Sequence, residues 1–447
     1  MTRPHPPPRS DRSRAGIGRR AASGAFLLLL VAVPLTVLDL SAADSRTAPA
    51  TGYLSPSAAF GASVSDLPGP DTLPRARIDY DSLVQAGEIP PPDRGYAAEL
   101  DSSGRAALRL PRASGVVHGT MAGNADFEIC LPLEGWNGRL VVWVPGGAGT
   151  EHQGGARIRP AALAQGYGYA TTDLGLSLST MADPANRFTQ ARPSAVRLTR
   201  YAERLAARHY GRGPPDRTYV AGHSYGAHLA TRLMEEHPEI YDAGIRHAGL
   251  NWIYQVTRAL AIWPRHGDVR PVEPVMYDVG ARLPNGFTYR LGQERGTEDR
   301  WEVAAPGWRR LLAALIPAVD PSYDPNGDGE LSPGEIERWD ADERPSGVAG
   351  RLAGTAVTGR LAGKMIAFAG LADVFSPPST ERAYQRLVRE TGAGGRVVLY
   401  LEEGAGHRHG FPARLDPAGE PTGFWPEALR TLDRWVVRDE PPGEITG

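Results

Sequence analysis

The residues best able to do chemistry in this chain form the pentapeptide Gly222-His223-Ser224-Tyr225-Gly226. A strand-like run, Arg217–Ala221, precedes it, and a helix-like run, Ala227–Glu236, follows it. A serine between two glycines at a strand-to-helix junction is typical of a nucleophile elbow, because glycine permits the tight turn that raises the serine hydroxyl above a sheet. We therefore predict that Ser224 is a nucleophile. The alternative is an ordinary glycine-rich turn.

A serine hydroxyl becomes nucleophilic only when a base takes its proton, and an imidazole base needs a carboxylate to fix its tautomer. Downstream of an elbow of this kind, the acid precedes the histidine in the chain. Asp373 follows the strand-like run Lys364–Ala369, and His407 follows the strand-like run Arg396–Leu401. Both residues should lie at the carboxyl edge of one sheet and complete a Ser-Asp-His triad. The alternatives are a structural turn aspartate at the first position and His409 as the base.

The oxyanion that forms during acyl transfer requires two hydrogen-bond donors. The backbone N–H of Tyr225, directly after the nucleophile, is the first candidate. The second is expected from Pro145–Gly149, a glycine-rich loop after the buried strand Leu140–Val144. Glycine lets the backbone approach a substrate oxygen closely, so Gly147 is the predicted donor. The alternative is a flexible loop without a role.

A second motif satisfies the pattern D-x-N-x-D-G-x₅-E, which is that of an EF-hand calcium loop. Oxygen donors at alternate positions, followed by a glutamate that binds through both oxygens, suit the coordination of Ca²⁺. The predicted ligands are Asp324, Asn326, Asp328, the backbone carbonyl of Glu330, Ser332 and Glu335. Pro317, Pro321 and Pro325 argue against a regular incoming helix, so we expect an EF-hand-like loop that binds calcium structurally. The alternative is an acidic turn.

The composition is that of an ordinary globular protein. The 447 residues carry a net charge of −2 and 41% of them are hydrophobic, so no strong positive field favours nucleic acid. Cys130 is the single cysteine, which excludes an intrachain disulfide. We expect no organic cofactor and no nucleic-acid partner. Stabilisation beyond the core must come from metal or packing.

The N-terminal segment has the pattern of an export signal. Residues 1–20 are rich in arginine, an apolar stretch covers Ala25–Leu38, and Ser41-Ala42-Ala43 provides a small-residue cleavage site. The apolar stretch is shorter than the about 20 residues that cross a bilayer, and Pro34 interrupts it. We therefore predict a secreted protein, cleaved before Asp44, without stable membrane insertion after signal removal. The alternative is retention at the membrane by an uncleaved signal.

Around these motifs, strand-like and helix-like runs alternate. An antiparallel meander of Ala107–Leu110, Phe127–Leu131 and Leu140–Val144 is expected to lead into the sheet. Further expected strands are Tyr167–Thr172 and Ala243–His247, and the expected helices are Arg159–Ala164, Pro193–Tyr210, Ser379–Thr391 and Pro426–Val437. The alternation predicts an α/β fold with a mostly parallel central sheet and helices on both faces.

The alternation stops between His247 and Leu361, where a helix at Trp308–Ile316 is expected among prolines and tryptophans. An insertion of this length at the carboxyl edge of the sheet would cover the elbow as a lid. The expected segments are a signal peptide (1–43), a Pro/Ala/Ser-rich lead-in (44–105), the first part of the sheet domain (106–247), the lid insertion (248–361) and the second part of the sheet domain (362–440).

With these motifs assembled, the chain resembles exported α/β-hydrolases of the tannase and feruloyl esterase family over approximately residues 135–440. The resemblance rests on Gly135-Trp136-Asn137-Gly138, Ala162–Tyr167 before Thr172-Asp173, His209-Tyr210-Gly211, Gly370–Asp373 with Pro377-Pro378, and Gly404–His407. Members of that family hydrolyse aromatic carboxylic esters with a Ser-Asp-His triad beneath a lid that often carries calcium. The resemblance thus implies an α/β-hydrolase fold with a large lid insertion and a small-molecule or oligomeric ester substrate.

One feature of that family is missing from this chain. The family typically joins the residue before the serine to the residue after the histidine by a disulfide. Here these positions hold His223 and Arg408. The triad is therefore expected to be held together by packing alone, in a divergent branch with another ester substrate.

The combined expectation is an exported serine hydrolase that cleaves carboxylic esters through an acyl-enzyme intermediate. A serine peptidase or a polyester-oligomer hydrolase needs the same triad and differs only in its pocket, so both remain alternatives. A third alternative is a calcium-stabilised binding protein with an inactive hydrolase fold. The intact order of Ser224, Asp373 and His407 argues against it.

Overall fold

The computed structural model describes residues 97–99, 114–121, 125–146, 158–174, 191–251, 279–282, 288–297, 301–328, 331–407, 414–415, 421–422 and 424–443. All of them belong to one of the chain's two compact units, Ala62–Gly447. The expected signal peptide, most of the lead-in and the strand expected at Ala107–Leu110 lie outside the described residues. Among the helices described, none is both long enough and apolar enough to cross a membrane.

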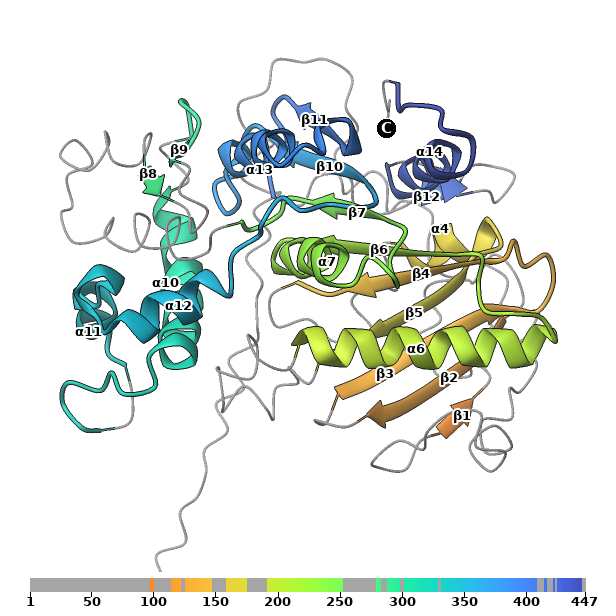
Figure 1. Cartoon of the computed structure of the whole chain (residues 1–447), viewed down its shortest axis with the longest axis horizontal. Helices are drawn as coiled ribbons and strands as arrows, with labels where there is room; N and C mark the ends of the chain where they lie inside the picture. Colours follow the sequence, from red (N-terminus) through yellow and green to blue (C-terminus); the bar gives the residue numbers. More distant parts are fainter. Residues whose placement is uncertain are drawn as a thin grey trace, which may run out of the picture. The chain divides into compact units, whose positions relative to one another are not determined.

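A nine-stranded sheet organises the described residues (Figure 1). Its strands lie in the order β1-β2-β3-β5-β4-β6-β7-β10-β11. Their bounds are β1 Ala97–Glu99, β2 Ser114–Met121, β3 Ala125–Pro132, β4 Arg139–Val144, β5 Gly168–Thr172, β6 Arg217–His223, β7 Ala243–His247, β10 Lys364–Gly370 and β11 Val397–Glu402. Every neighbouring pair from β5 to β11 is parallel, whereas β1, β2, β3 and β5 pair antiparallel. The predicted mostly parallel sheet is confirmed.

The order of the first strands differs from the expected meander. β3 pairs with β5 rather than with β4, and Tyr169 of β5 lies opposite Cys130 of β3 on one side and Val141 of β4 on the other. After β4 the chain forms helix α4 (Arg159–Ala164) and returns as β5, so β5 runs parallel to β4, as a crossover connection requires. An antiparallel pair of β3 and β4 was therefore a wrong expectation, because β5 occupies the place between them.

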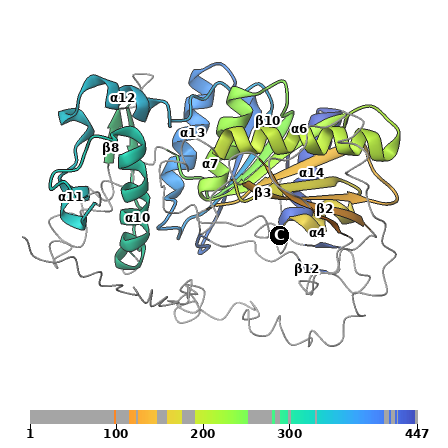
Figure 2. The same cartoon turned by 90° about the horizontal axis from the view of Figure 1, so that it is seen from below.

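Helices cover the sheet on both sides (Figure 2), and alternate residues of the central strands contribute to the two hydrophobic cores beneath them. On β4, Val142 and Val144 belong to the first core, whereas Val141 and Trp143 belong to the second. The helices of the first core include α6 (Ala191–Tyr210), α7 (Tyr225–Glu236) and α13 (Pro378–Glu390), and those of the second are α4 and α14 (Phe424–Arg438). Because successive strand side chains point to opposite faces, the sheet is covered by helices on both sides, as predicted.

Between β7 and β10 the chain forms elements that do not extend the main sheet (Figure 1). They are β8 (Val279–Arg282), β9 (Thr288–Leu291), α10 (Trp301–Val319), α11 (Pro333–Arg338), the 3-10 helix η5 (Ala341–Glu343) and α12 (Ser346–Ala353). The remaining short elements are η6 (Gly394–Arg396), β12 (Arg414–Leu415) and β13 (Pro421–Thr422). β8 pairs with β9 and β12 with β13 in separate two-stranded sheets.

Helix α10 is longer than the expected Trp308–Ile316, and it continues through Pro317. The expectation that prolines prevent a regular incoming helix is therefore wrong for Pro317, whereas α10 ends at Val319, before Pro321 and Pro325, and does not run directly into the loop. A proline inside a helix removes one hydrogen bond and crowds the carbonyl four residues earlier, but Leu315 and Ile316 are fully buried in the first core. Packing of this apolar face stabilises the helix more than the lost hydrogen bond weakens it.

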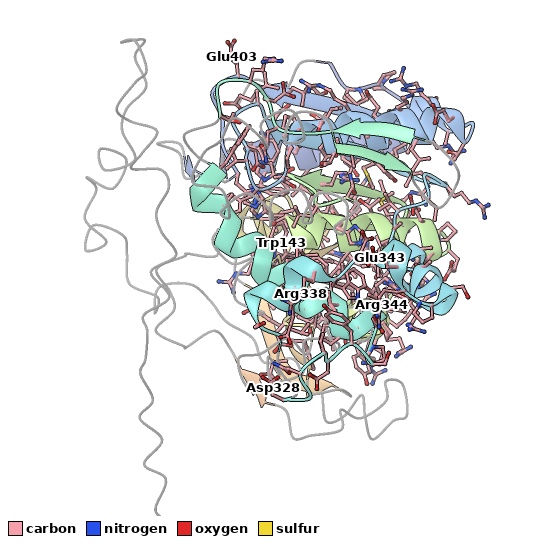
Figure 3. All side chains as sticks on the ribbon, turned by 90° about the vertical axis from the view of Figure 1, so that its left-hand side faces the viewer. Trp143, Asp328, Arg338, Glu343, Arg344 and Glu403 are labelled. Atoms are coloured by element: carbon pink, nitrogen blue, oxygen red, sulfur yellow. The ribbon has the colours of Figure 1, made fainter. Side chains whose placement is uncertain are left out.

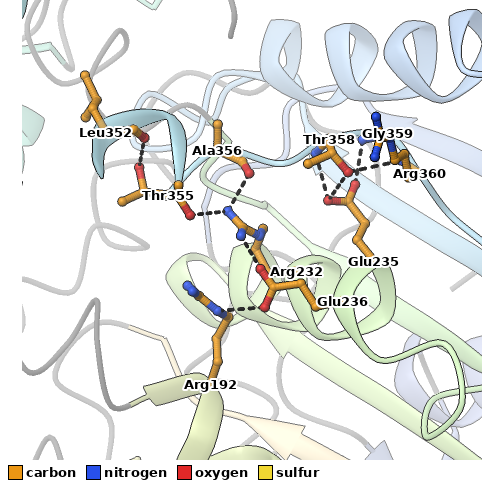
Figure 4. Close-up of polar contacts among 11 residues, drawn as sticks. Arg192, Arg232, Glu235, Glu236, Leu352, Thr355, Ala356, Thr358, Gly359 and Arg360 are labelled. Carbon is orange, nitrogen blue, oxygen red and sulfur yellow. Dashed lines mark hydrogen bonds and ion pairs between the residues drawn. The ribbon is translucent and has the colours of Figure 1, made fainter. Parts of the chain in front are cut away.

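An arginine and a glutamate of α7 fix the end of the insertion (Figure 4). Arg232 donates from Nη1 to the carbonyl oxygen of Gly354 at 2.7 Å. Glu235 accepts the backbone N–H groups of Thr358 and Gly359, each at 2.7 Å. Burial raises the pKa of Glu235, and these hydrogen bonds oppose the rise. The helix that follows the nucleophile therefore also holds the segment that leads back into β10.

A buried ion pair joins β7 to α13. Arg246 and Glu381 are 0% and 1% exposed, and Arg246 Nε lies 3.0 Å from Glu381 Oε2. Glu381 Oε1 accepts the backbone N–H of Gly249 at 2.7 Å, and Arg246 donates to Thr231 Oγ1 and Asn251 Oδ1. Burial raises the pKa of Glu381, and the charge of Arg246 opposes the rise. The pair thus fixes the loop after β7, which borders the backbone of the elbow.

We expect Glu381→Gln to lower the free energy of unfolding by roughly 3–5 kcal/mol, because it leaves the Arg246 charge buried without its partner. Urea unfolding of the variant and the wild type measures the difference. Glu390→Gln on the same helix is the matched control, since its partner Arg386 is 62% exposed, and its change should stay within about 0.5 kcal/mol. Equal stability of Glu381→Gln and the wild type would contradict the structural role of the pair.

Candidate active site

Ser224 occupies a sharp turn between β6 and α7. Its φ of 58° and ψ of −124° are values that residues with a side chain rarely adopt. Its backbone N–H donates to the carbonyl oxygen of His247 on β7 at 2.9 Å. A Cβ on Gly226 would come within 2.1 Å of the carbonyl oxygen of Val144 on β4, so only glycine allows α7 to start this close to the sheet. Two strands and a helix therefore hold the strained serine in place.

The loop after β4 lies directly against this turn. A Cβ on Gly146 would come within 2.3 Å of the His223 carbonyl oxygen and 3.2 Å of Ser224 Cβ, which excludes any larger residue. Tyr225 is the first residue of α7, where a backbone N–H has no acceptor within its own helix. Gly147, the predicted second oxyanion donor, lies outside the described residues.

The predicted acid and base are hydrogen-bonded to each other. His407 Nδ1 lies 2.8 Å from Asp373 Oδ2. Asp373 is 1% exposed, and its other oxygen accepts the backbone N–H groups of Phe375 and Ser376, each at 2.9 Å. Because an ionised carboxylate only accepts, Nδ1 of His407 carries the hydrogen, and Nε2 is the nitrogen that can take up a proton. His409, the alternative base, lies outside the described residues.

Neighbouring parallel strands bring this pair together. Asp373 follows β10, and His407 follows β11, which lies beside it in the sheet. The two loops are also joined directly, because the backbone N–H of Ala372 donates to the carbonyl oxygen of Ala405 at 2.9 Å. The acid and the base therefore belong to one hydrogen-bonded unit at the carboxyl ends of the strands.

His223 connects the predicted base to the strand that precedes the predicted nucleophile. Its Nε2 lies 2.7 Å from the carbonyl oxygen of His407, and the centres of the two rings are 4.7 Å apart. The expectation that packing alone holds the triad residues together is therefore wrong. The two histidines are 184 positions apart, so no local pattern of the sequence indicated this contact.

The insertion also contacts the loop of the acid, which the sequence did not indicate either. Gln293, which is 6% exposed, donates from Nε2 to the carbonyl oxygen of Val374 at 2.9 Å. Ser379 Oγ accepts the N–H of Gly292 at 2.9 Å and donates to its carbonyl oxygen at 2.7 Å. Residues 292–293 therefore fix the insertion to the segment that begins at Asp373.

The EF-hand-like loop follows α10 after residues 320–323. Asp324 Oδ1 accepts the N–H of Gly327 at 2.8 Å, and Asn326 Oδ1 accepts the N–H of Asp328 at 3.1 Å. Glu330 lies outside the described residues. Within the described part of the chain, no three His, Cys, Asp or Glu side chains come together as a metal cluster. The oxygen donors suit calcium, but in this arrangement they bond to their own loop.

Glu335, the expected bidentate ligand, caps helix α11. It is 2% exposed, and its Oε2 accepts from the backbone N–H and the hydroxyl of Ser332 at 2.9 and 2.7 Å. Ser332 Oγ in turn accepts the N–H of Glu335 at 3.3 Å, so the two residues form a capping box. Calcium binding would require the carboxylate of Glu335 to turn from this cap toward the loop.

Asp320 ties the two ends of this segment together through hydrogen bonds. It accepts from Trp339 Nε1 at 3.0 Å, Arg344 Nε at 2.6 Å and Ser322 Oγ at 2.9 Å. Burial alone would raise the pKa of Asp320, but these hydrogen bonds outweigh it and hold the pKa below its usual value. In Figure 3, Asp328 and Glu403 lie at opposite edges of the molecule. Glu403 belongs to the loop that carries the predicted base. The EF-hand-like loop therefore lies far from the turn that follows β11.

Comparison with known proteins agrees with this fold. No protein-family model and no curated protein sequence matches the chain. Among solved structures, feruloyl esterase B from Aspergillus oryzae has a TM-score of 0.53 at 13% identity, covering 74% of this chain and 81% of that one. An esterase from Aspergillus oryzae gives 0.52 at 12% identity, with 74% and 81% covered. Tannin acyl hydrolase from Aspergillus niger gives 0.50 at 15% identity, with 80% and 87% covered.

At these identities the similarity concerns the fold and not the substrate. The similarity extends over 74–80% of this chain and 81–87% of the other chains. The strand-to-helix turn at Ser224 stands where this fold places a nucleophile. This chain has an α/β-hydrolase fold and resembles the structures of feruloyl esterase and tannase.

Proposed function

We propose that this protein is a serine hydrolase that cleaves carboxylic esters. The main support is the 2.8 Å hydrogen bond between His407 Nδ1 and Asp373 Oδ2 in a chain whose strained elbow holds Ser224. A buried carboxylate that fixes the Nδ1–H tautomer prepares Nε2 to act as the base for a serine hydroxyl.

In the proposed reaction, His407 Nε2 takes the hydroxyl proton of Ser224 while Oγ attacks the carbonyl carbon of the ester. The backbone N–H groups of Tyr225 and Gly147 stabilise the oxyanion of the tetrahedral intermediate. The intermediate collapses to an acyl-serine, and the departing alcohol receives the proton from His407. Water, deprotonated by the same histidine, then attacks the acyl-serine and releases the carboxylic acid and free Ser224.

We infer that the substrate is a small-molecule or oligomeric ester and that the insertion 248–361 covers the site. The solved structures with the same fold are named as esterases and a tannin acyl hydrolase, which supports the first inference. The contact of Gln293 with the carbonyl of Val374, next to the acid, supports the second. An insertion that covers the site would shape the pocket for the acyl or alcohol group.

A substrate panel tests the proposed function. Purified protein is assayed with p-nitrophenyl, hydroxycinnamoyl and galloyl esters and with peptides, and Ser224→Ala protein serves as the blank. Ester turnover above the blank supports the proposal. Cleavage of peptides alone would replace it with a peptidase, and a folded protein that cleaves neither would indicate an inactive binding protein.

We also propose that the loop Asp324–Glu335 binds calcium for stability and that the protein is exported. The spacing of the oxygen donors supports the first, and the N-terminal sequence pattern supports the second. Asp328 lies far from the loop that carries His407, which agrees with an ion that stabilises the fold and takes no part in the reaction. Export with signal removal predicts a mature protein that begins at Asp44, which N-terminal sequencing of the culture supernatant would reveal.

Calcium is expected to stabilise the wild type but not Glu335→Gln. At ~100-fold excess over its dissociation constant, calcium should raise the free energy of unfolding by roughly 2.7 kcal/mol. Glutamine at this position keeps the capping box with Ser332 but cannot bind calcium through two carboxylate oxygens. Thermal unfolding in calcium and in chelator compares the two proteins, and Glu343→Gln, an exposed acid nearby, is the control. If the wild type melts at the same temperature in both buffers, the loop is an acidic turn.

A further inference from the structure

His223, the residue before the nucleophile, contacts the base of the triad through its side chain. Its Nε2 lies 2.7 Å from the carbonyl oxygen of His407. A carbonyl oxygen only accepts, so Nε2 carries the hydrogen and donates it. We propose that His223 is a positioning residue that holds His407 against the elbow through this bond, a role that rests on the proposed function.

The loop that follows β11 and carries His407 needs such a contact because of where it lies. β11 is the last strand of the sheet order and has β10 on one side. Residues 401–404, which lead into the loop, are exposed. The bond from Ala372 to Ala405 ties this loop to the loop of the acid. That bond sets the distance between base and acid, but it does not set the distance of either from Ser224.

The two hydrogen bonds of His407 constrain different parts of the residue. Asp373 Oδ2 accepts from Nδ1 and thereby fixes the rotation and the tautomer of the ring. His223 donates to the backbone carbonyl and thereby fixes the position from which the ring projects. The reacting Nε2 is placed only when the position and the rotation are both set.

His223 is itself held firmly enough to serve as an anchor. It is 5% exposed, and its ring stacks on that of His247 with centres 4.9 Å apart and planes at 23°. The two residues are register partners on β6 and β7. His247 also accepts the backbone N–H of Ser224 at 2.9 Å. The ring that holds the base and the backbone of the nucleophile are therefore fixed to the same point of β7.

Two substitutions separate this role from simple packing. His223→Gln places an amide N–H₂ the same number of bonds from Cβ as the native Nε2, so the donor is retained. His223→Asn places it one bond too short to reach the carbonyl. Misplacing a catalytic group by about 1 Å costs on the order of 10²-fold in rate. We expect kcat of His223→Asn to fall about 10- to 100-fold with KM nearly unchanged, whereas His223→Gln stays within a few-fold of the wild type.

The experiment measures kcat, KM, melting temperature and the rate at which a fluorophosphonate labels Ser224. His237→Asn is the matched control, because His237 lies beyond the other end of α7 and should leave every value unchanged. Equal activity of the Gln and Asn variants, or a loss of activity that follows a loss of melting temperature, overturns the positioning role. If the wild type is labelled but turns over no ester, the proposed function fails while the labelling rates still decide the role of His223. A wild type that is not labelled overturns both.

Discussion

Ser224→Ala is expected to abolish ester turnover while the protein stays folded. The loss in kcat/KM should be on the order of 10³-fold or more, because no other group at the elbow can form the acyl intermediate. Alanine removes only the hydroxyl and leaves the strained turn between β6 and α7 in place. Initial rates with an ester substrate, together with circular dichroism and the melting temperature, measure both parts of the expectation.

Ser346→Ala is the control for this experiment, since Ser346 is an exposed serine at the start of α12. Its activity should equal that of the wild type. A fluorophosphonate should also label the wild type at Ser224 and leave Ser224→Ala unlabelled. Substantial hydrolysis by a folded Ser224→Ala protein would assign the nucleophile to another residue.

Asp373→Asn is expected to lower kcat by ~10⁴-fold, the cost seen when an asparagine presents the wrong tautomer of the base. The amide nitrogen of the introduced side chain donates where Oδ2 of Asp373 accepts from His407 Nδ1 at 2.8 Å, so the ring would no longer be held with Nδ1 protonated. The shape of the site stays nearly the same, which separates this effect from packing. Steady-state kinetics measures the loss, and an unchanged kcat would exclude Asp373 as the acid.

The base is tested in the same assay by two alanine variants. His407→Ala should block fluorophosphonate labelling of Ser224, because the hydroxyl then has no base within reach. His409→Ala should leave labelling unchanged. The opposite result, with labelling lost only in His409→Ala, would transfer the role of the base to His409.

Most strands and helices of the sheet domain follow from the sequence. The expected strand Ala243–His247 and the expected helix Arg159–Ala164 have the same bounds in the structure, and α6 begins two residues before the expected Pro193. These elements have strong apolar periodicity and clear end signals, which depend only on neighbouring residues. The acid and base candidates could be chosen for the same reason, because each follows the end of a recognisable strand.

The errors concern contacts between segments that are distant in the sequence. The order β3-β5-β4 could not be derived from the strands alone, because each strand has apolar residues on both faces and fits several neighbours. Helix α10 continues through Pro317 because its apolar face is buried in the first core, which the local proline signal could not show. The buried pair of Arg246 and Glu381 likewise depends on how α13 packs on β7.

The sequence by itself predicted the chemistry that we propose for this protein. The elbow of Ser224, the order of acid and base, and the oxygen-rich loop at Asp324–Glu335 are patterns of residue type and spacing, and such patterns can be recognised without a fold. Only the tertiary structure decided that His407 bonds to Asp373, that His223 holds its carbonyl and that Glu335 caps a helix. Local propensity acts between neighbours along the chain, whereas these contacts depend on strand order, register and side-chain rotamers, which are set when the whole core packs.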